Sequence, residues 1–227
     1  MLIEGAVTLR RVFNYLSMAI VMILILSGCQ NGSQEETKQH SETKHAETKQ
    51  IKLSEQDRDT LKQELLKIAD EYAQDQHKAV SNRYFSRNEQ MEGDGYAISD
   101  DGEIQITDHD KPGRKHFNIH NVVGLTMYQS KHNQGGYDER AQDLTNIQGY
   151  SSVAKMDQPI TKYLFADNGK VYEYQFKPNS EPSLSTGFAT KDYNGKDPNL
   201  KPNEKFTVSK DKILNKKWKM LLSEYKW

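Results

Sequence analysis

The chain has 227 residues, with 31 basic and 32 acidic side chains and a formal net charge of −1. This balance excludes the strongly basic composition of proteins that bind the nucleic-acid backbone, so we expect no nucleic-acid partner. A single cysteine, Cys29, excludes a disulfide bond within the chain. The length suits one ordinary domain accompanied by non-globular segments.

Residues 1–28 have the pattern of an export signal. Arg10 and Arg11 precede an uncharged, mainly aliphatic run at residues 12–26. A basic segment followed by a short apolar segment is typical of such signals. The run is shorter than the roughly 20 apolar residues that a transmembrane helix needs. Glu4 is unusual in such a region, and translation starting downstream of Met1 would remove it.

The apolar run ends in Leu26-Ser27-Gly28-Cys29, which resembles the lipobox of bacterial lipoproteins. The resemblance implies diacylglycerol addition to the Cys29 thiol, cleavage after Gly28, and a mature chain that begins at Cys29. Two acyl chains hold a protein stably on a membrane, because each buried CH₂ contributes about 0.8 kcal/mol. An ordinary secretory signal with an accidental cysteine and an uncleaved N-terminal helix are the alternatives.

This resemblance predicts a lipid-anchored protein on the outer face of the cell membrane, similar to small cell-envelope lipoproteins of Gram-positive bacteria. Residues 29–52 then form a lipidated, disordered polar tether. The tripeptide Glu-Thr-Lys recurs at 36–38, 42–44 and 47–49, and the segment has too few apolar residues to offset the entropy of ordering. The alternative is a frayed extension of the following helix.

Residues 53–227 are predicted to form a single α+β domain that begins with a helix over residues 55–76. Ser54 and Asp57 have the spacing of a capping box, in which two side chains satisfy free backbone N–H groups. An apolar residue then recurs at helical spacing on one face. The positions are Leu61, Leu65, Ile68 and Tyr72.

Most of the middle of the chain is predicted to form an antiparallel sheet of several strands. Residues 96–98 and 103–107 flank an Asp-Gly turn, and residues 161–166 and 170–176 flank Asp167-Asn168-Gly169. Polar and apolar residues partly alternate in the last of these strands, which suits a sheet with one covered face. Residues 116–128 are predicted to be a further strand.

The C-terminal part is predicted to contain a long irregular connection and an amphipathic helix. Four prolines interrupt residues 177–206, where we expect at most a short strand near 184–190, and such a loop is usually functional or mobile. A helix over 211–225, capped by Ser209, places apolar residues on one face. They are Leu214, Trp218, Leu221, Leu222 and Tyr225. We expect this face to pack in the core, the alternative being a lysine-rich surface that binds anionic lipid or wall polymer.

The sequence contains few candidates for a chemical site. His116 and His120 lie about 13 Å apart if both belong to one strand, which is too far for one metal ion. The acidic cluster 100–103 is a turn rather than a calcium loop, and Gly135-Gly136-Tyr137 is expected to be a loop. No catalytic motif is recognisable, so we expect no catalytic residue and no cofactor.

These features favour a membrane-anchored, non-enzymatic binding or interaction module with an unidentified protein, peptide or cell-wall partner. The alternative is a membrane-tethered metal-binding protein or hydrolase that uses the region of His109, His116 and His120. A solute-binding lipoprotein of a transporter is disfavoured, because such proteins need two α/β lobes.

Overall fold

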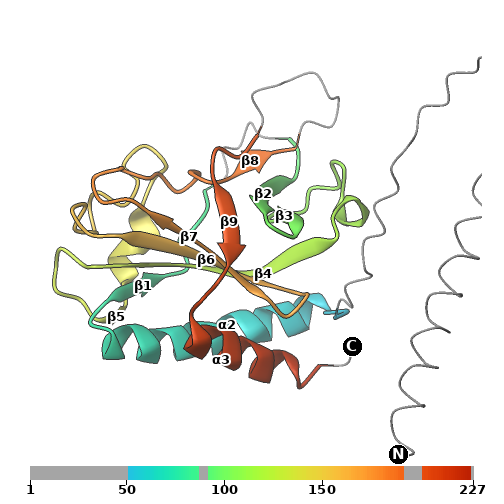
Figure 1. Ribbon diagram of the computed structural model, residues 1–227, viewed down its shortest axis with the longest axis horizontal. Coiled ribbons are helices and arrows are strands. Elements are labelled where there is room, and N and C mark those ends of the chain that lie inside the picture. Colours follow the sequence, from blue (N-terminus) through green and yellow to red (C-terminus); the bar gives the residue numbers. More distant parts are fainter. Residues whose placement is uncertain (1–50, 87–91, 192–200, 226–227) are drawn as a thin grey trace, which may run out of the picture. The chain divides into compact units, whose positions relative to one another are not determined.

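The computed structural model describes residues 51–86, 92–191 and 201–225. The predicted export signal, Cys29 and the predicted tether as far as residue 50 lie outside these ranges. The described residues form an α+β fold with an N-terminal helix, a six-stranded mixed β-barrel carrying extra strands, and a C-terminal helix (Figure 1). The predicted fold class is therefore confirmed. Within the same ranges, no helix has the length and apolar character needed to span a membrane.

Helix α2 (Glu55–Asp75) begins as the sequence predicts. The Asp57 N–H donates to Ser54 Oγ at 3.2 Å, and the Ser54 N–H donates to Asp57 Oδ2 at 2.9 Å, which completes the capping box. The buried residues of the helix are Leu61, Leu65, Ala69 and Ala73. Ile68 and Tyr72, which were predicted to lie on the buried face, are only partly buried. The two alanines allow the helix to lie close to the sheet.

Within the described residues, nine strands and two short 3₁₀ helices follow α2. The 3₁₀ helices are η2 (Arg114–His116) and η3 (Glu139–Asp143). The strands are β1 (Ala79–Ser81), β2 (Gly95–Ser99), β3 (Gly102–Gln105), β4 (Ile119–Tyr128), β5 (Gly136–Tyr137), β6 (Ile160–Ala166), β7 (Val171–Phe176), β8 (Ala189–Thr190) and β9 (Lys205–Val208).

Six of these strands close into a ring in the order β3-β2-β9-β7-β6-β4, with β4 pairing back to β3. The prediction that the sheet is antiparallel is wrong for two pairs of the ring, because β2–β9 and β3–β4 are parallel. The two predicted hairpins, β2–β3 and β6–β7, are confirmed. Strands β1 and β5 extend the sheet beyond β4, and β8 pairs with β2.

Three local predictions need correction. Residues 205–206, placed at the end of the irregular connection, belong to β9, which closes the barrel. Gly136–Tyr137, expected in a loop, forms β5 and pairs in parallel with β1. His116 ends η2, and the strand predicted over 116–128 begins only at Ile119.

Helix α3 (Lys212–Leu222) packs beside α2 on the same side of the strands (Figure 1). Its N-cap is Asp211, whose carboxylate accepts from the Ile213 and Leu214 N–H groups, and not the predicted Ser209. Leu214, Trp218 and Leu222 are fully buried, which confirms the prediction that this face belongs to the core.

The barrel interior contains a fully buried lysine. Lys162 Nζ on β6 donates to the carbonyl oxygens of Ser183, Leu184 and Thr186 at 3.2, 2.7 and 2.8 Å. Burial lowers the pKa of Lys162 well below its usual range, while the three acceptors match the three N–H bonds of an ammonium group. Lys162 thereby ties the connection after β7 to the barrel.

Candidate functional site

A cleft of about 480 Å³ opens between the first turns of α2 and the ends of β3 and β4. Three basic side chains line it: Arg58 and Lys62 from α2, and Arg114 from η2. Two carboxylates, Glu55 and Asp108, also lie on its wall. The basic residues come from distant parts of the sequence, so the cleft exists only once the barrel and α2 have come together.

The turn between β6 and β7 fixes one wall of this cleft. Its first residue, Asp167, is fully buried, and its N–H donates to the His120 carbonyl at 3.0 Å. The Asp167 carbonyl accepts from the Ile51 N–H at 3.3 Å, while the Ala166 carbonyl accepts from Trp218 Nε1 at 3.0 Å. Ile51, assigned to the tether by the sequence analysis, is thus a buried part of the fold.

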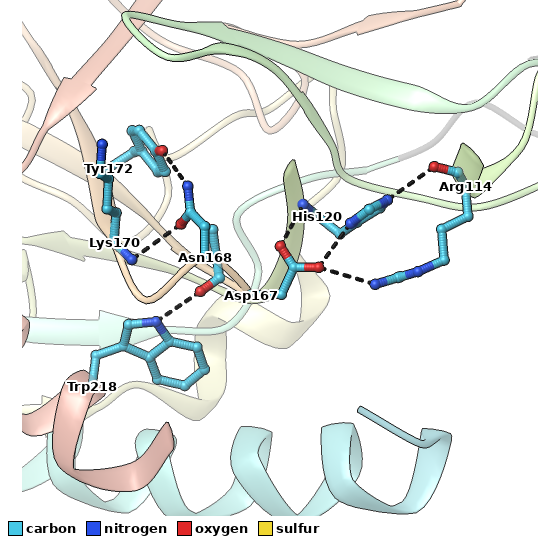
Figure 2. A network of polar contacts seen from close by, with 8 residues as sticks. Arg114, His120, Asp167, Asn168, Lys170, Tyr172 and Trp218 are labelled. Carbon is cyan, nitrogen blue, oxygen red and sulfur yellow. Dashed lines mark hydrogen bonds and ion pairs between the residues drawn. The ribbon is translucent and has the colours of Figure 1, made fainter. Parts of the chain in front are cut away.

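The Asp167 carboxylate holds both Arg114 and His120 (Figure 2). Arg114 Nη2 donates to Asp167 Oδ2 at 3.0 Å, and His120 Nδ1 lies 2.7 Å from the same oxygen. The His120 N–H donates to Asp167 Oδ1 at 3.0 Å. Hydrogen bonds between charged groups are stronger than neutral ones, so the contact with Asp167 fixes the position of the Arg114 guanidinium.

His120 has no ring nitrogen left for a ligand. Its Nε2 lies 3.0 Å from the Arg114 carbonyl oxygen, and its Nδ1 faces Asp167. Both ring nitrogens are therefore engaged within the protein. We conclude that His120 helps to hold Arg114 in place in two ways. It contacts the Arg114 carbonyl oxygen directly, and it contacts the Asp167 carboxylate that binds the Arg114 guanidinium.

Arg58 is one of two cleft residues, within the described ranges, that have a buried polar atom without a hydrogen-bond partner. Its Nη2 atom is buried and has no hydrogen-bond partner among the described residues. Burial lowers the pKa of Arg58, and the like charge of Arg114 acts in the same direction, whereas Asp167 and Asp108 oppose it. A guanidinium remains charged in proteins, so this buried N–H group needs an acceptor.

Asn121 and Tyr84 form the inner wall. Asn121 Nδ2 donates to Tyr84 Oη at 2.9 Å, but the Asn121 Oδ1 atom is buried without a partner within the described ranges. The Tyr84 ring lies directly on Gly124, where an added Cβ would be only 2.2 Å from the ring. Glycine at position 124 is therefore required for Tyr84 to reach the cleft.

Asp94 holds the loop that forms the outer wall. This fully buried carboxylate accepts from the backbone N–H groups of His109 at 2.6 Å and of Gly113 at 2.7 Å. Gln105 Nε2 also donates to it at 3.2 Å. The loop carries Asp108 into the cleft and leads to Arg114, so Asp94 contributes to the position of both residues.

The histidines that the sequence singled out do not come together as a ligand set. His116 is exposed at the end of η2, His109 lies in the Asp94 loop, and His120 is bonded to Asp167. Across the part of the chain that the structure describes, no group of three or more His, Cys, Asp or Glu side chains could hold a metal ion. Cys29, the predicted lipidation residue, lies outside the described ranges.

Sequence reasoning missed Arg58, Arg114 and Asn121. One signal was present: Arg58 lies three residues before Leu61 and seven before Leu65, so it occupies the next position of the apolar stripe. A charged residue there is buried by the fold and must find a partner. Arg114 and Asn121 had no such signal, because their positions depend on the parallel pairing of β3 with β4.

No known family model, curated protein or solved structure matches this chain.

Proposed function

We propose that this protein is a membrane-anchored lipoprotein of the outer face of the cell membrane, whose head is a non-enzymatic binding module. The support for the anchor is Leu26-Ser27-Gly28-Cys29 after a short apolar run. Replacing Cys29 with Ala removes the thiol that accepts the lipid, so the processed, acylated species should disappear from the membrane fraction by intact-mass measurement. An exported wild-type protein with a free Cys29 thiol would contradict the proposed anchor.

The head, in this proposal, binds an anionic group in the cleft between α2, β3 and β4. The observation that carries the proposal is the buried Arg58 Nη2 atom, which has no partner among the described residues and belongs to a side chain that lines the same cleft as Arg114. A carboxylate or phosphate oxygen would satisfy this donor and would lie between two guanidinium groups. Arginine is suited to this task because its planar donors match both oxyanions.

The geometry gives less support to catalysis. His120 is enclosed by Asp167 and the Arg114 carbonyl, so it has no free nitrogen to act as a base toward a bound molecule. The other polar groups of the cleft include the cationic side chains of α2 and η2, two carboxylates and the Asn121 amide. The cationic groups can recognise and orient an anion without a chemical step.

Thermal unfolding of the full-length protein tests this binding role. A ligand that binds only the folded state stabilises it by mass action, by about 2.7 kcal/mol at a concentration of 100 Kd. Sodium acetate should raise the melting temperature more than sodium chloride of equal ionic strength does. The Arg58→Gln variant should lose the difference between the two salts, because the unpaired donor is gone.

Arg140→Gln is the matched control, since Arg140 lies on η3, does not line the cleft, and is about half exposed beside Asp138. This variant should keep the full acetate effect. An acetate effect that is equal in wild type and Arg58→Gln would contradict the proposed site.

A further inference from the structure

The two unpartnered atoms of the cleft are complementary in kind. Arg58 Nη2 is a cationic donor, whereas Asn121 Oδ1 is an acceptor. Asn121 is 9% exposed, and both residues line the same cleft. A simple inorganic anion would satisfy Arg58 alone. A ligand that satisfies both atoms needs an acidic oxygen and an N–H group close to it.

A second groove, of about 250 Å³, continues from the cleft along α2. The two share Lys62, Tyr84 and Val122. Beyond these shared residues, the walls of the second groove are mainly apolar, with Leu66 on one side and Val123 to Leu125 on the other. The cationic cleft therefore leads directly into a groove that suits aliphatic side chains.

The edge of β4 faces this groove. Four consecutive residues, 122–125, line the groove. Because a strand presents only every second side chain to one face, this pattern indicates that the groove lies against the edge of β4. β3 pairs with β4 only at residues 119–120, and β1 only at 126–128. No described strand pairs with residues 121–125 on the side away from β6. This gap is about 13 Å long, at roughly 3.3 Å per residue.

We propose that the cleft and groove together bind the C-terminus of an extended peptide. The terminal carboxylate lies at Arg58 and Arg114, and a backbone N–H near the terminus donates to Asn121 Oδ1. The preceding residues lie along the gap in β4, with an aliphatic side chain in the groove beside Leu66. Added strands of this kind derive affinity from main-chain hydrogen bonds and specificity from alternate side chains.

Other ligands with a carboxylate use fewer of these features. A fatty acid would occupy the apolar groove and reach the arginines, but it has no N–H group for Asn121 and no backbone for the β4 edge. A free amino acid would offer an N–H group to Asn121, but it has no preceding residues to lie along the β4 edge. The peptide terminus is the ligand class that matches the cationic, accepting and apolar parts at once.

This inference rests on the proposed anion-binding function, and the test separates the two. The full-length protein is immobilised and exposed to two pools of N-acetylated hexapeptides, randomised at every position. One pool ends in a free carboxylate and the other in a carboxamide. Retained peptides are quantified by mass spectrometry, and acetate binding is measured in parallel by the thermal shift.

We expect free-acid peptides to be retained at least tenfold more than the carboxamides, with aliphatic residues enriched near the terminus. Arg58→Gln should remove most of this preference, Arg58→Lys should keep part of it, and Arg140→Gln should keep all of it. Asn121→Leu should reduce peptide retention while preserving the acetate effect, because acetate makes no use of Asn121.

Equal retention of both pools by the wild-type protein, with an intact acetate effect, would overturn the peptide inference and leave the anion site standing. Retention that Arg58→Gln leaves unchanged would also overturn the inference, since the carboxylate would then bind elsewhere. Loss of the acetate effect itself would overturn the proposed function and the inference together.

Discussion

Asp167 and His120 lie 47 residues apart in the sequence and make a short, buried polar contact behind the cleft wall, with 2.7 Å between Oδ2 and Nδ1. A second bond joins the His120 N–H to Asp167 Oδ1 at 3.0 Å. The pair connects the β6–β7 turn to the first residues of β4 and holds Arg114 in place (Figure 2). The position of the Arg114 guanidinium in the cleft thus depends on the buried Asp167 carboxylate.

We expect Asp167→Asn to destabilise the fold by about 2 kcal/mol, because the buried carboxylate accepts hydrogen bonds from His120 and Arg114 that the amide cannot all replace. The partial exposure of Arg114 screens part of this effect, so most of it should come from His120. Urea denaturation measures the change. Asp100→Asn, which breaks an exposed pair with Lys205, should cost less than about 1 kcal/mol. Equal effects of the two substitutions would contradict the role of Asp167.

Gly124→Ala tests the contact between β4 and Tyr84. The new Cβ would lie 2.2 Å from the Tyr84 ring, so the ring must move. Forcing extra volume into a packed site costs about 1–3 kcal/mol, and the acetate effect should weaken as the cleft wall shifts. Gly135→Ala is the control, because the nearest atom to its Cβ is Gln74 Cα at an ordinary 3.8 Å. A harmless Gly124→Ala would show that Tyr84 is not held there.

Alkaline pH should unfold the protein between about pH 10 and 12. Burial raises the pKa of Tyr84 to about 12, and it also raises the pKa values of Tyr150 and Tyr163 above the usual value near 10. A raised folded-state pKa gives stability that is fully present below pH 10 and is lost as the pH rises through the folded value. Tyrosinate absorbance at 295 nm should rise together with the loss of circular dichroism. Ionisation of these tyrosines at pH 10 in a folded protein would contradict their burial.

Trp218→Ala should destabilise the fold by about 3–5 kcal/mol, as expected for deletion of a large buried aromatic side chain. The residue is fully buried and packs edge-to-face on Phe165. Changing Lys212, Lys216 and Lys219 to Gln should alter stability by less than about 0.5 kcal/mol, because these side chains are exposed. The reverse order in urea denaturation would show that α3 is held by its charges rather than by its apolar face.

The local elements of this fold were predictable from the sequence because their signals are local. The Ser54 and Asp57 capping box begins α2, and the Asp-Gly and Asn-Gly turns form the hairpins β2–β3 and β6–β7. The core face of α3 followed from the spacing of Leu214, Trp218 and Leu222. Each of these patterns involves residues within a few turns or strand positions of one another.

The closure of the barrel was not predictable in this way. Strand β9 has four residues, of which only Phe206 is buried, so its alternation is too short to distinguish it from a loop. The parallel pair β3–β4 depends on the Asp94 loop, whose hydrogen bonds leave no periodic pattern. Lys162 looks like a surface residue in the sequence and becomes buried because three carbonyls of a distant loop surround it.

The same reason explains why the cleft escaped sequence analysis. Arg58, Arg114 and Asn121 are brought together by α2, η2 and β4, and their proximity arises from the sheet topology. The histidines drew attention because their spacing is visible in the sequence, yet His120 supports Arg114 and His116 is exposed.

The most direct test of the anion-binding cleft is a titration of the full-length protein with sodium acetate, followed by the side-chain N–H signals of its arginines in a ¹⁵N–¹H spectrum. The Arg58 and Arg114 signals should shift together along one saturable binding curve, while the Arg140 signal stays in place. Small, non-saturating shifts that are equal for all three arginines would contradict a specific anion site in this cleft.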